Sequence, residues 1–398
     1  MPWQEVSIMD QRREFVRLAT AEGANRRELC RRFAISPQTG YKWLSRWEAG
    51  GDAALADRSR RPQRSPERTG SDLERHILKL RDAHPAWGAR KIARCLARAE
   101  IVPPASSTVH EVLRRNERIV DAPGGSVGYE RFERSAPNQL WQMDFKGWVT
   151  LASGMRCHPL TIEDDHSRYL LCLQACADQQ GSTDQQGSTV QSHLTATFRR
   201  YGLPDAMFVD NGSPWGGSGF ADRWTRLGVW LMKLGVSVLH SRPYHPQSRG
   251  KNERLHRTLN AEVLSLRRLR DFADAQAAFD GWRGVYNQER PHEALGQEVP
   301  ASRYRPSGRS MPEELPQPHY DIGDIVRRVG TTKAYIRFKG RLWPVGQAFF
   351  GEQVALRPRG ADGRYGIFFG AHHIASIDLT QARGVNHVPE QVSTMSSD

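Results

Sequence analysis

The pattern of apolar residues changes twice along this sequence, and the two changes dictate three kinds of structure. Up to about residue 122 the apolar residues recur at helical spacing. From 138 to 304 short apolar runs alternate with helical patterns, and beyond 320 strand-like runs follow one another. With 398 residues the chain is also too long for one compact core. We therefore expect a multidomain protein with an all-α front, an α/β centre and a small β end.

Two short helical patterns between residues 26 and 47 predict a helix-turn-helix in a first domain, residues 1–56. Ser36 is a good N-cap for the second helix, and Pro37 suits its first turn. A plain helical hairpin fits the same pattern. If the motif binds DNA, side chains on the exposed face of its second helix reach base edges and phosphates. The DNA contacts expected there are Gln38, Tyr41, Lys42 and Arg46.

Residues 57–68 are rich in arginine, proline and serine, so they cannot form a regular helix. We interpret them as a linker. Arg58, Arg60 and Arg61 are expected to lie along a minor groove, although a linker that is merely charged has the same composition.

A second helical set, residues 69–122, has the stripe Leu73, Ile77 and Leu80 and a later helix that Ser107 is expected to cap. It predicts a second helix-turn-helix. Arg114 and Arg115 would face DNA from its last helix. Two such units in tandem are typical of proteins that read an extended asymmetric site.

The net charge of +13 favours a polyanionic partner, but many basic proteins have a solvated basic surface and no such role. The five cysteines are scattered, and no apolar N-terminal run resembles a signal peptide, so we expect a cytoplasmic protein. Cys172 and Cys176 are predicted to be core residues of one strand rather than zinc ligands.

The α/β centre has five strand-like runs, at residues 140–151, 155–163, 169–177, 206–209 and 236–241. The hexapeptide DQQGST occurs at 178–183 and again at 184–189. An exact repeat this short does not indicate a solenoid. We interpret it as a duplication in a polar loop, where insertions are tolerated at little cost.

Three acidic residues lie in settings that suit a divalent cation. Asp144 interrupts an apolar strand, Asp210 ends another before an Asn-Gly turn, and Glu253 lies near the start of a helix. The apolar stripe of that helix is predicted to run through Leu255, Leu259, Val263 and Leu266. Taken singly, each acid has a plain structural explanation: a salt-bridged strand residue, a turn former and a helix-start carboxylate.

Taken together, these motifs resemble the bacterial insertion-sequence transposases of the Asp-Asp-Glu class, whose catalytic domain is shared with retroviral integrases. The segments DDHSRYL at 164–170 and YNQERPHEALGQEVPASRY at 286–304 also look like parts of that core. The resemblance is strong over residues 138–304, and the paired helix-turn-helix front is similar to the family's usual arrangement.

The resemblance implies an RNase H-like integrase core over residues 138–304, with a mixed five-stranded sheet. It implies that Asp144, Asp210 and Glu253 are catalytic and bind two Mg²⁺ ions, for which Mn²⁺ can substitute. Such ions activate water, and later the freed 3′-hydroxyl, for attack on a phosphodiester. One site then both cleaves and joins DNA.

This sequence departs from the family pattern in two places. The stretch between Asp210 and Glu253 is longer than usual, and Asn260 stands where a basic residue is common. Arg254 and Arg257 remain as candidate phosphate contacts on the same helix. The other candidate DNA contacts of the core are Lys146, Asn211 and Lys251, and His256 is expected beside them or in a structural hydrogen bond.

Residues 320–379 predict a small β-barrel-like domain, and residues 380–398 a tail. The domain is basic enough to touch DNA, but a protein–protein module fits as well. Its basic residues include Arg327, Arg328, Arg337, Lys339, Arg341, Arg357 and Arg359.

The expected function is that of a transposase that binds the terminal repeats of its insertion sequence, cleaves the ends and joins the 3′-hydroxyls to target DNA. The expected partners are double-stranded DNA and, in the synaptic complex, a homodimer or higher oligomer. Two alternatives stay open. A catalytically impaired, transposase-derived regulator would bind DNA without cutting it, and a site-specific nuclease would hydrolyse DNA without joining it.

Overall fold

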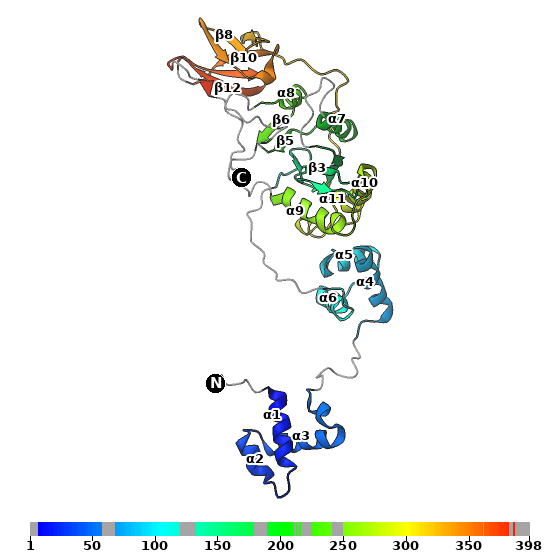
Figure 1. The fold of residues 1–398 in the computed structure, drawn as a ribbon. Helices are drawn as coiled ribbons and strands as arrows, with labels where there is room; N and C mark the ends of the chain where they lie inside the picture. The colour runs from blue at the N-terminus through cyan, green and yellow to red at the C-terminus, as the bar shows by residue number, and fades with distance from the viewer. Residues whose placement is uncertain are drawn as a thin grey trace. The chain divides into compact units, whose positions relative to one another are not determined.

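The structure is a computed structural model, shown in Figure 1. It describes residues 7–57, 68–119, 133–178, 189–210, 212, 215, 224–240, 250–360, 362–381 and 385–386. The chain divides into two compact units, Met1–Arg68 and Thr69–Asp398. No helix in the described ranges is long and apolar enough to cross a membrane.

The first unit is helical, as the sequence predicts. Its elements are α1 (Ile8–Ala19), α2 (Arg26–Arg32), α3 (Pro37–Gly50) and a short 3₁₀ turn (Asp52–Leu55). The Ser36 hydroxyl accepts a hydrogen bond from Thr39 N at 3.2 Å, with Pro37 in the first turn, so the predicted cap of α3 is confirmed. Phe15, Cys30 and Leu44 lie in the buried core between the three helices.

The second unit begins with three more helices: α4 (Ser71–Ala83), α5 (Ala89–Arg98) and α6 (Ser106–Arg115). Ile77, Trp87 and Val109 are among their buried core residues. The predicted Ser107 cap is wrong. Helix α6 begins one residue before Ser107, and its N-cap is Ala105, which has no side-chain oxygen to accept a capping hydrogen bond.

A mixed sheet follows, in the order β2-β3-β1-β5-β6, with β4 on β3. Its strands are β1 (Trp141–Phe145), β2 (Val149–Thr150), β3 (Arg156–Asp164), β4 (Leu170–Cys176), β5 (Ala206–Val209) and β6 (Ser237–His240). Strand β1 runs antiparallel to β3 and parallel to β5, and β5 is parallel to β6. Cys172 and Cys176 are both buried in β4, as predicted.

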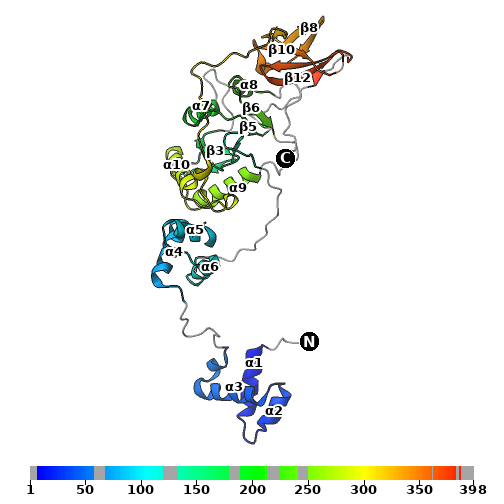
Figure 2. The ribbon, with the colours of Figure 1, turned by 180° about the vertical axis from the view of Figure 1, so that it is seen from behind.

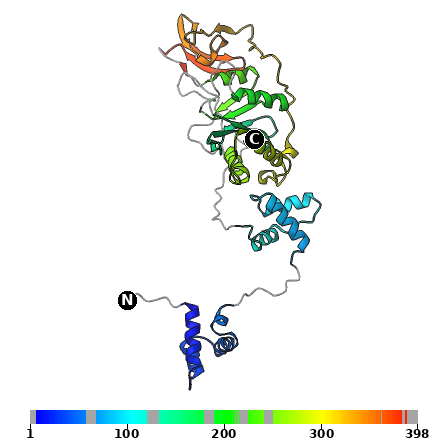
Figure 3. The same ribbon diagram turned by 45° about the vertical axis from the view of Figure 1, so that its right-hand side comes forward.

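Helices cover both faces of this sheet. They are α7 (Thr189–Tyr201), α8 (Arg226–Lys233), α9 (Gly250–Leu259), α10 (Phe272–Gln288) and α11 (Pro300–Arg303). Helices α7 and α8 share one apolar cluster with the sheet, and α9 and α10 share another. Figure 3 shows these pairs on opposite sides of the strands, the first in green and the second in yellow-green.

The single strand predicted at residues 140–151 is two strands in the structure, β1 and β2. The run at 140–151 is interrupted after Phe145, where Gly147 has a φ of +95°. Phe145 pairs with Leu160 but Val149 pairs with Cys157, so this side of the ladder has one residue more than β3. The extra residue makes a bulge just beyond Asp144.

The stripe predicted for the helix of Glu253 is right up to Val263 and wrong at Leu266. Leu255, Leu259 and Val263 are buried, but Leu266 is 53% exposed. The helix ends with a π-helical turn over Asn260–Leu264, so Leu266 lies in the turn beyond the last helical residue.

The C-terminal part is the expected small β domain, seen with the core in Figure 2. Strands β7 (Ile325–Arg328), β10 (Gln353–Pro358), β11 (Arg364–Phe369), β12 (His372–Asp378) and β13 (Val385–Asn386) form an antiparallel sheet. Strands β8 (Tyr335–Phe338) and β9 (Arg341–Pro344) form a hairpin, and a 3₁₀ turn (Gln347–Phe349) follows. Because β13 pairs with β12, part of the predicted tail belongs to the sheet.

The β domain packs on the α/β core through α8. The indole Nε1 of Trp224 donates to Ile374 O at 3.1 Å, and Lys233 on α8 pairs with Glu352 at 2.7 Å. Buried residues of both regions, such as Leu231 and Phe349, lie in one continuous apolar cluster.

A buried carboxyl links α10 to the sheet. Glu163 on β3 is 2% exposed and accepts a hydrogen bond from the Tyr286 hydroxyl at 3.0 Å. Burial raises the pKa of Glu163 to about 7, although the nearby charges of Arg168 and Lys251 oppose the rise. Asp165 acts in the same direction as burial, because it is a second negative charge close by.

Gly40 is required at the crossing of α2 and α3. A Cβ at this position would lie 2.6 Å from Cys30 Sγ and 2.9 Å from the Phe15 ring. We expect Gly40→Ala to destabilise the first unit by about 1–3 kcal/mol, because the contact overpacks the core. Amide exchange of α2 and α3 should rise. The control is Gly281→Ala in α10, where nothing lies within 4 Å of the new Cβ; exchange of α2 and α3 as slow in Gly40→Ala as in this control would contradict the prediction.

The pKa of Glu163 predicts a pH dependence of stability. Because the folded state binds this proton more tightly than the unfolded chain, the contribution of Glu163 to the free energy of unfolding is fully present below pH 4.5 and is lost as the pH rises through 7. Glu163→Gln cannot ionise, so it should lose less stability over this range, with a difference of about 3 kcal/mol at most. Chemical denaturation at several pH values measures this. Equal slopes for the wild type and the variant would refute it, and exposed Asp205→Asn is the control.

Candidate active site

Asp144 and Asp210 lie side by side at the same end of the sheet. Strands β1 and β5 are parallel, with Trp141 beside Met207 and Gln142 beside Phe208. Continued by two residues, this register sets Asp144 beside Asp210, the residue that directly follows β5. Adjacent strands are about 4.8 Å apart, so the two residues are neighbours across the strands. Both residues are half-buried.

Asp210 accepts hydrogen bonds from the turn after β5 and from β6. Gly212 N donates to Asp210 Oδ1 at 2.9 Å, and His240 Nδ1 donates to Asp210 O at 3.0 Å. A Cβ on Gly212 would lie 3.3 Å from Oδ2 and 3.4 Å from Oδ1 of the same carboxylate. The glycine of the predicted Asn-Gly turn therefore leaves room for the carboxylate. Asn211 itself lies outside the described residues.

Helix α9 carries Glu253 in its first turn, exposed to solvent, and packs against β1. His256, one turn later, reaches the cross-strand neighbour of Asp144. Its Nε2 lies 3.0 Å from the Thr161 hydroxyl, which donates its hydrogen to Asp144 O, also at 3.0 Å. Because a hydroxyl has only one hydrogen, His256 Nε2 must be the donor to Thr161.

His256 is therefore a structural hydrogen-bond donor, one of the two roles expected for it. Burial and, to a smaller extent, the positive charge of Lys146 lower the pKa of His256 to about 4. The imidazole is neutral at physiological pH. Lys146 is itself half-buried, and burial lowers the pKa of its ammonium group.

The structure brings two acids together and the third only into their neighbourhood. Among the described residues, no three His, Cys, Asp or Glu side chains lie close enough to hold a metal ion. Residues 241–249, which lead into α9, are outside those residues. The metal triad of Asp144, Asp210 and Glu253 remains a prediction.

The predicted DNA contacts differ in what surrounds them. Gln38, Tyr41 and Lys42 are exposed on α3, and the Arg46 guanidinium lies 4.9 Å from the Trp43 ring. Arg254 and Arg257 are exposed on α9, and exposed Arg114 pairs with Glu111 on its own helix at 2.7 Å. The three linker arginines Arg58, Arg60 and Arg61 lie outside the described residues.

Besides Arg114, two of the predicted DNA contacts have partners inside the protein. Arg115 makes two hydrogen bonds to the Glu74 carboxylate, at 3.0 and 2.6 Å. Lys251 is 18% exposed and forms an ion pair with buried Asp165. Both side chains are only partly exposed and are held by ion pairs, and their roles as DNA contacts remain predictions.

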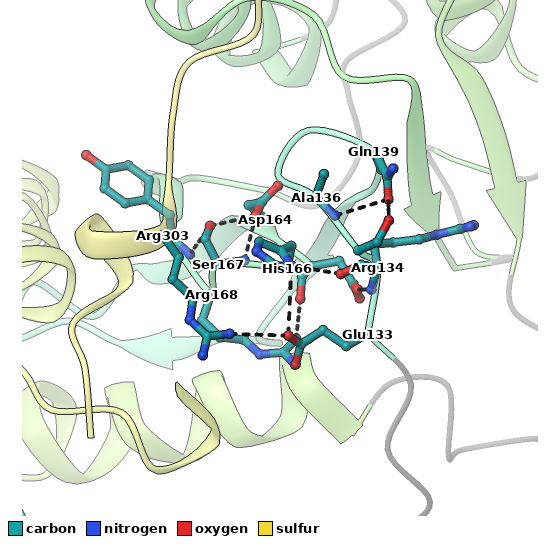
Figure 4. Close-up of polar contacts among 12 residues, drawn as sticks. Glu133, Arg134, Ala136, Gln139, Asp164, His166, Ser167, Arg168 and Arg303 are labelled. Atoms are coloured by element: carbon teal, nitrogen blue, oxygen red, sulfur yellow. Dashed lines mark hydrogen bonds and ion pairs between the residues drawn. The ribbon is translucent and has the colours of Figure 1, made fainter. Parts of the chain in front are cut away.

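The DDHSRYL segment forms the β3–β4 turn and holds the segment that leads into the core (Figure 4). Asp164 accepts hydrogen bonds from Ser167 N and Oγ at 2.8 and 2.6 Å, and from Asn138 N at 2.7 Å. Arg168 donates to Glu133 at 3.0 Å, and Arg303 lies 3.6 Å from the same carboxylate. Residues 133–138 are thereby fixed to the sheet.

Sequence reasoning gave no role to Thr161, Asp165 or Gly212. Thr161 is an ordinary strand residue in sequence, and only the strand register shows it beside Asp144. Asp165 carried a signal, because a second acid directly after a strand is unusual unless something pairs with it.

Several protein families match parts of the chain. A helix-turn-helix domain matches residues 11–63, and a homeodomain-like domain matches 39–113. Two integrase core domain families match 134–246 and 234–300. The C-terminal domain of the IS481 family transposases matches 324–384.

Curated relatives are also insertion-element proteins. An uncharacterised 39.2 kDa protein of insertion element IS476 from Xanthomonas euvesicatoria is 26% identical over 58% of this chain and 63% of its own length. An uncharacterised 31.7 kDa protein of IS407 from Burkholderia multivorans is 28% identical over 42% of this chain and 55% of its own length. The chain thus spans less than two thirds of either relative.

Matches among the solved structures include a simian T-cell lymphotropic virus intasome in complex with PP2A regulatory subunit B56 gamma. It has 14% identity and a TM-score of 0.36, and covers 79% of this chain and 96% of its own. The HTLV-2 integrase catalytic core with magnesium (16%, TM-score 0.31) covers 43% and 99%, and the Mos1 strand transfer complex (14%, TM-score 0.30) covers 71% and 91%. Likeness at these scores carries no argument about function.

The order of the matched families is helix-turn-helix, integrase core and transposase C-terminal domain, the same order in which the helical front, the mixed sheet and the β domain follow one another. This order, together with the insertion-element relatives, makes the chain similar to the bacterial insertion-sequence transposases with an integrase-type core.

Proposed function

We propose that this protein binds the terminal repeats of its insertion sequence, cleaves the DNA ends and joins their 3′-hydroxyls to target DNA. The observation that carries the proposal is the β1–β5 register, which sets Asp144 beside Asp210 where an integrase-type core would bind metal. We further propose that Glu253 completes the site, since α9 packs on β1 close to Asp144.

The donor set fits Mg²⁺ or Mn²⁺, because carboxylate oxygens are the hard ligands that these ions prefer. Asp144, Asp210 and Glu253 would hold two ions. Once bound, the ions would supply a lowered pKa for the attacking water or hydroxyl and neutralise charge on the phosphate. Space around the Asp210 carboxylate supports this fit, since Gly212 leaves the volume that a side chain would fill.

The chain's own groups would hold the DNA and fix the acids. The exposed face of α3, with Gln38, Tyr41 and Lys42, suits a major groove. Arg254 and Arg257 are exposed on the helix of Glu253 and would contact phosphates near the reacting bond. Because both ends of the element would be joined together, the active form would be a dimer or higher oligomer. Because its substrate would be bacterial DNA, the protein would act in the bacterial cytoplasm.

The direct test is strand joining by purified protein with an element-end oligonucleotide, target DNA and Mg²⁺. Asp144→Asn should lower joining by roughly 10³-fold or more, because a metal site stabilises the transition state by several kcal/mol. Binding of the end oligonucleotide should persist. The matched control is Asp205→Asn, an exposed acid just before β5 that pairs with Arg309 at 3.2 Å.

Other results would point elsewhere. A wild type that binds ends but produces no cut or joined product would favour the DNA-binding regulator. Cleavage without joined product would favour a nuclease. Full joining by Asp144→Asn would remove this aspartate from the chemistry.

Gly212→Ala is a finer test of the site. The added Cβ would press on the Asp210 carboxylate at 3.3 Å and displace it. We expect joining to fall by roughly 10- to 100-fold, the usual effect of disturbing groups that orient metal ligands, with little change in thermal stability. Joining at the wild-type rate would show that the turn does not hold Asp210 in place. The control is Gly284→Ala in α10, where nothing lies within 4 Å of the new Cβ.

A further inference from the structure

We propose that Lys251 and Asp165 are positioning residues for Glu253, because one buried carboxylate oxygen ties the helix of Glu253 to the strand of Asp144. The effect of these residues on catalysis rests on the proposed function. The contact of Lys251 with Asp165, called the tether below, is a structural observation and can be tested separately.

Asp165 is buried at the first position after β3 and is bound from three directions. Its Oδ1 accepts from Gln142 Nε2 at 2.6 Å and from Lys251 Nζ, and its Oδ2 accepts from Arg134 N at 2.8 Å. The Asp165 side chain has no exposed surface. A charged carboxylate in this position is tolerated only because the ammonium group and these donors compensate it.

The two donors to Oδ1 come from the two elements that carry predicted metal ligands. Gln142 is two residues before Asp144 on β1, so both side chains lie on the same face of the sheet. Lys251 is two residues before Glu253 on α9, and residues at this spacing lie on different faces of a helix. Lys251 can therefore point inward to Asp165 while Glu253 stays exposed.

Lys251 is poorly placed for any role that does not involve Asp165. A positive charge in the first turn of a helix opposes the macrodipole. The Lys251 side chain is also only 18% exposed, and moving a charge out of water is costly. A fully exposed lysine would avoid this second penalty, so its inward position is explained by the carboxylate that it reaches.

A second contact fixes α9 one turn later. The hydrogen bond of His256 to Thr161 locates the helix against β3, beside Asp144. Glu253 lies between Lys251 and His256 in sequence, so the helix is held on both sides of the acid. The tether at Lys251 sets how close the start of α9 comes to β1.

The test compares Lys251→Met and Asp165→Asn with Lys233→Met, in the full-length protein. Lys233 is a matched control, because it is also a buried lysine in an ion pair, with Glu352, on the far side of the sheet at the β domain. Two quantities are measured: amide exchange of residues 250–256, and the Mg²⁺ or Mn²⁺ concentration that gives half-maximal strand joining.

We expect Lys251→Met and Asp165→Asn to speed exchange at the start of α9 and to raise the required metal concentration about tenfold, as loss of ligand-orienting groups does. Lys233→Met should change neither quantity. The double variant should resemble each single variant, because both remove the same link. Lys251→Arg, which keeps the charge, should recover part of the metal response.

Unchanged exchange in α9 in both single variants would overturn the tether. Faster exchange with an unchanged metal requirement would overturn the positioning role and leave only a structural one. If Lys251→Met does not fold, near-isosteric Asp165→Asn decides between these results. Failure of the proposed function is distinguishable, since the wild type would then give no joined product at any metal concentration while the exchange data still report on the tether.

Discussion

The parallel pairing of β1 with β5 is the constraint on which the rest of the site depends. The two strands are far apart in sequence, and only their register sets Asp144 beside Asp210. Two carboxylates at this separation repel each other unless a cation lies between them. Helix α9 packs against β1, the strand of Asp144. The backbone hydrogen bonds of the sheet therefore determine both where the two acids lie and which helix packs next to them.

Near Asp144 the interior of the core contains buried polar side chains at positions where apolar side chains would give a more stable fold. The sheet face under α9 is apolar toward β4, with Leu173 and Leu259 in the buried cluster, and polar toward β1, with Gln142, Thr161 and Glu163 buried. Polar groups of this kind add little net stability but accept only one geometry. The cost is visible in the raised pKa of Glu163 and in the lowered pKa of His256.

Much of this could be predicted from sequence, because the signals were local. The Ser36 cap, the strand at Ala206–Val209 and the change to a β domain all follow from short patterns. Features that depend on tertiary pairing could not be predicted. The bulge at Gly147 follows from the register with β3, and Leu266 is exposed because the helix ends with the π turn before it. The ion pair of Lys251 could not be predicted because its buried partner, Asp165, is distant in sequence.

The apolar cluster shared by α8 and the β domain makes these two parts one folding unit. Leu231 and Phe349 belong to the same interior, and the Trp224 indole is bonded across the boundary. A chain cut after the α/β core would leave this surface wet and prone to self-association. The C-terminal domain therefore completes the interior of the core and is not a separable module.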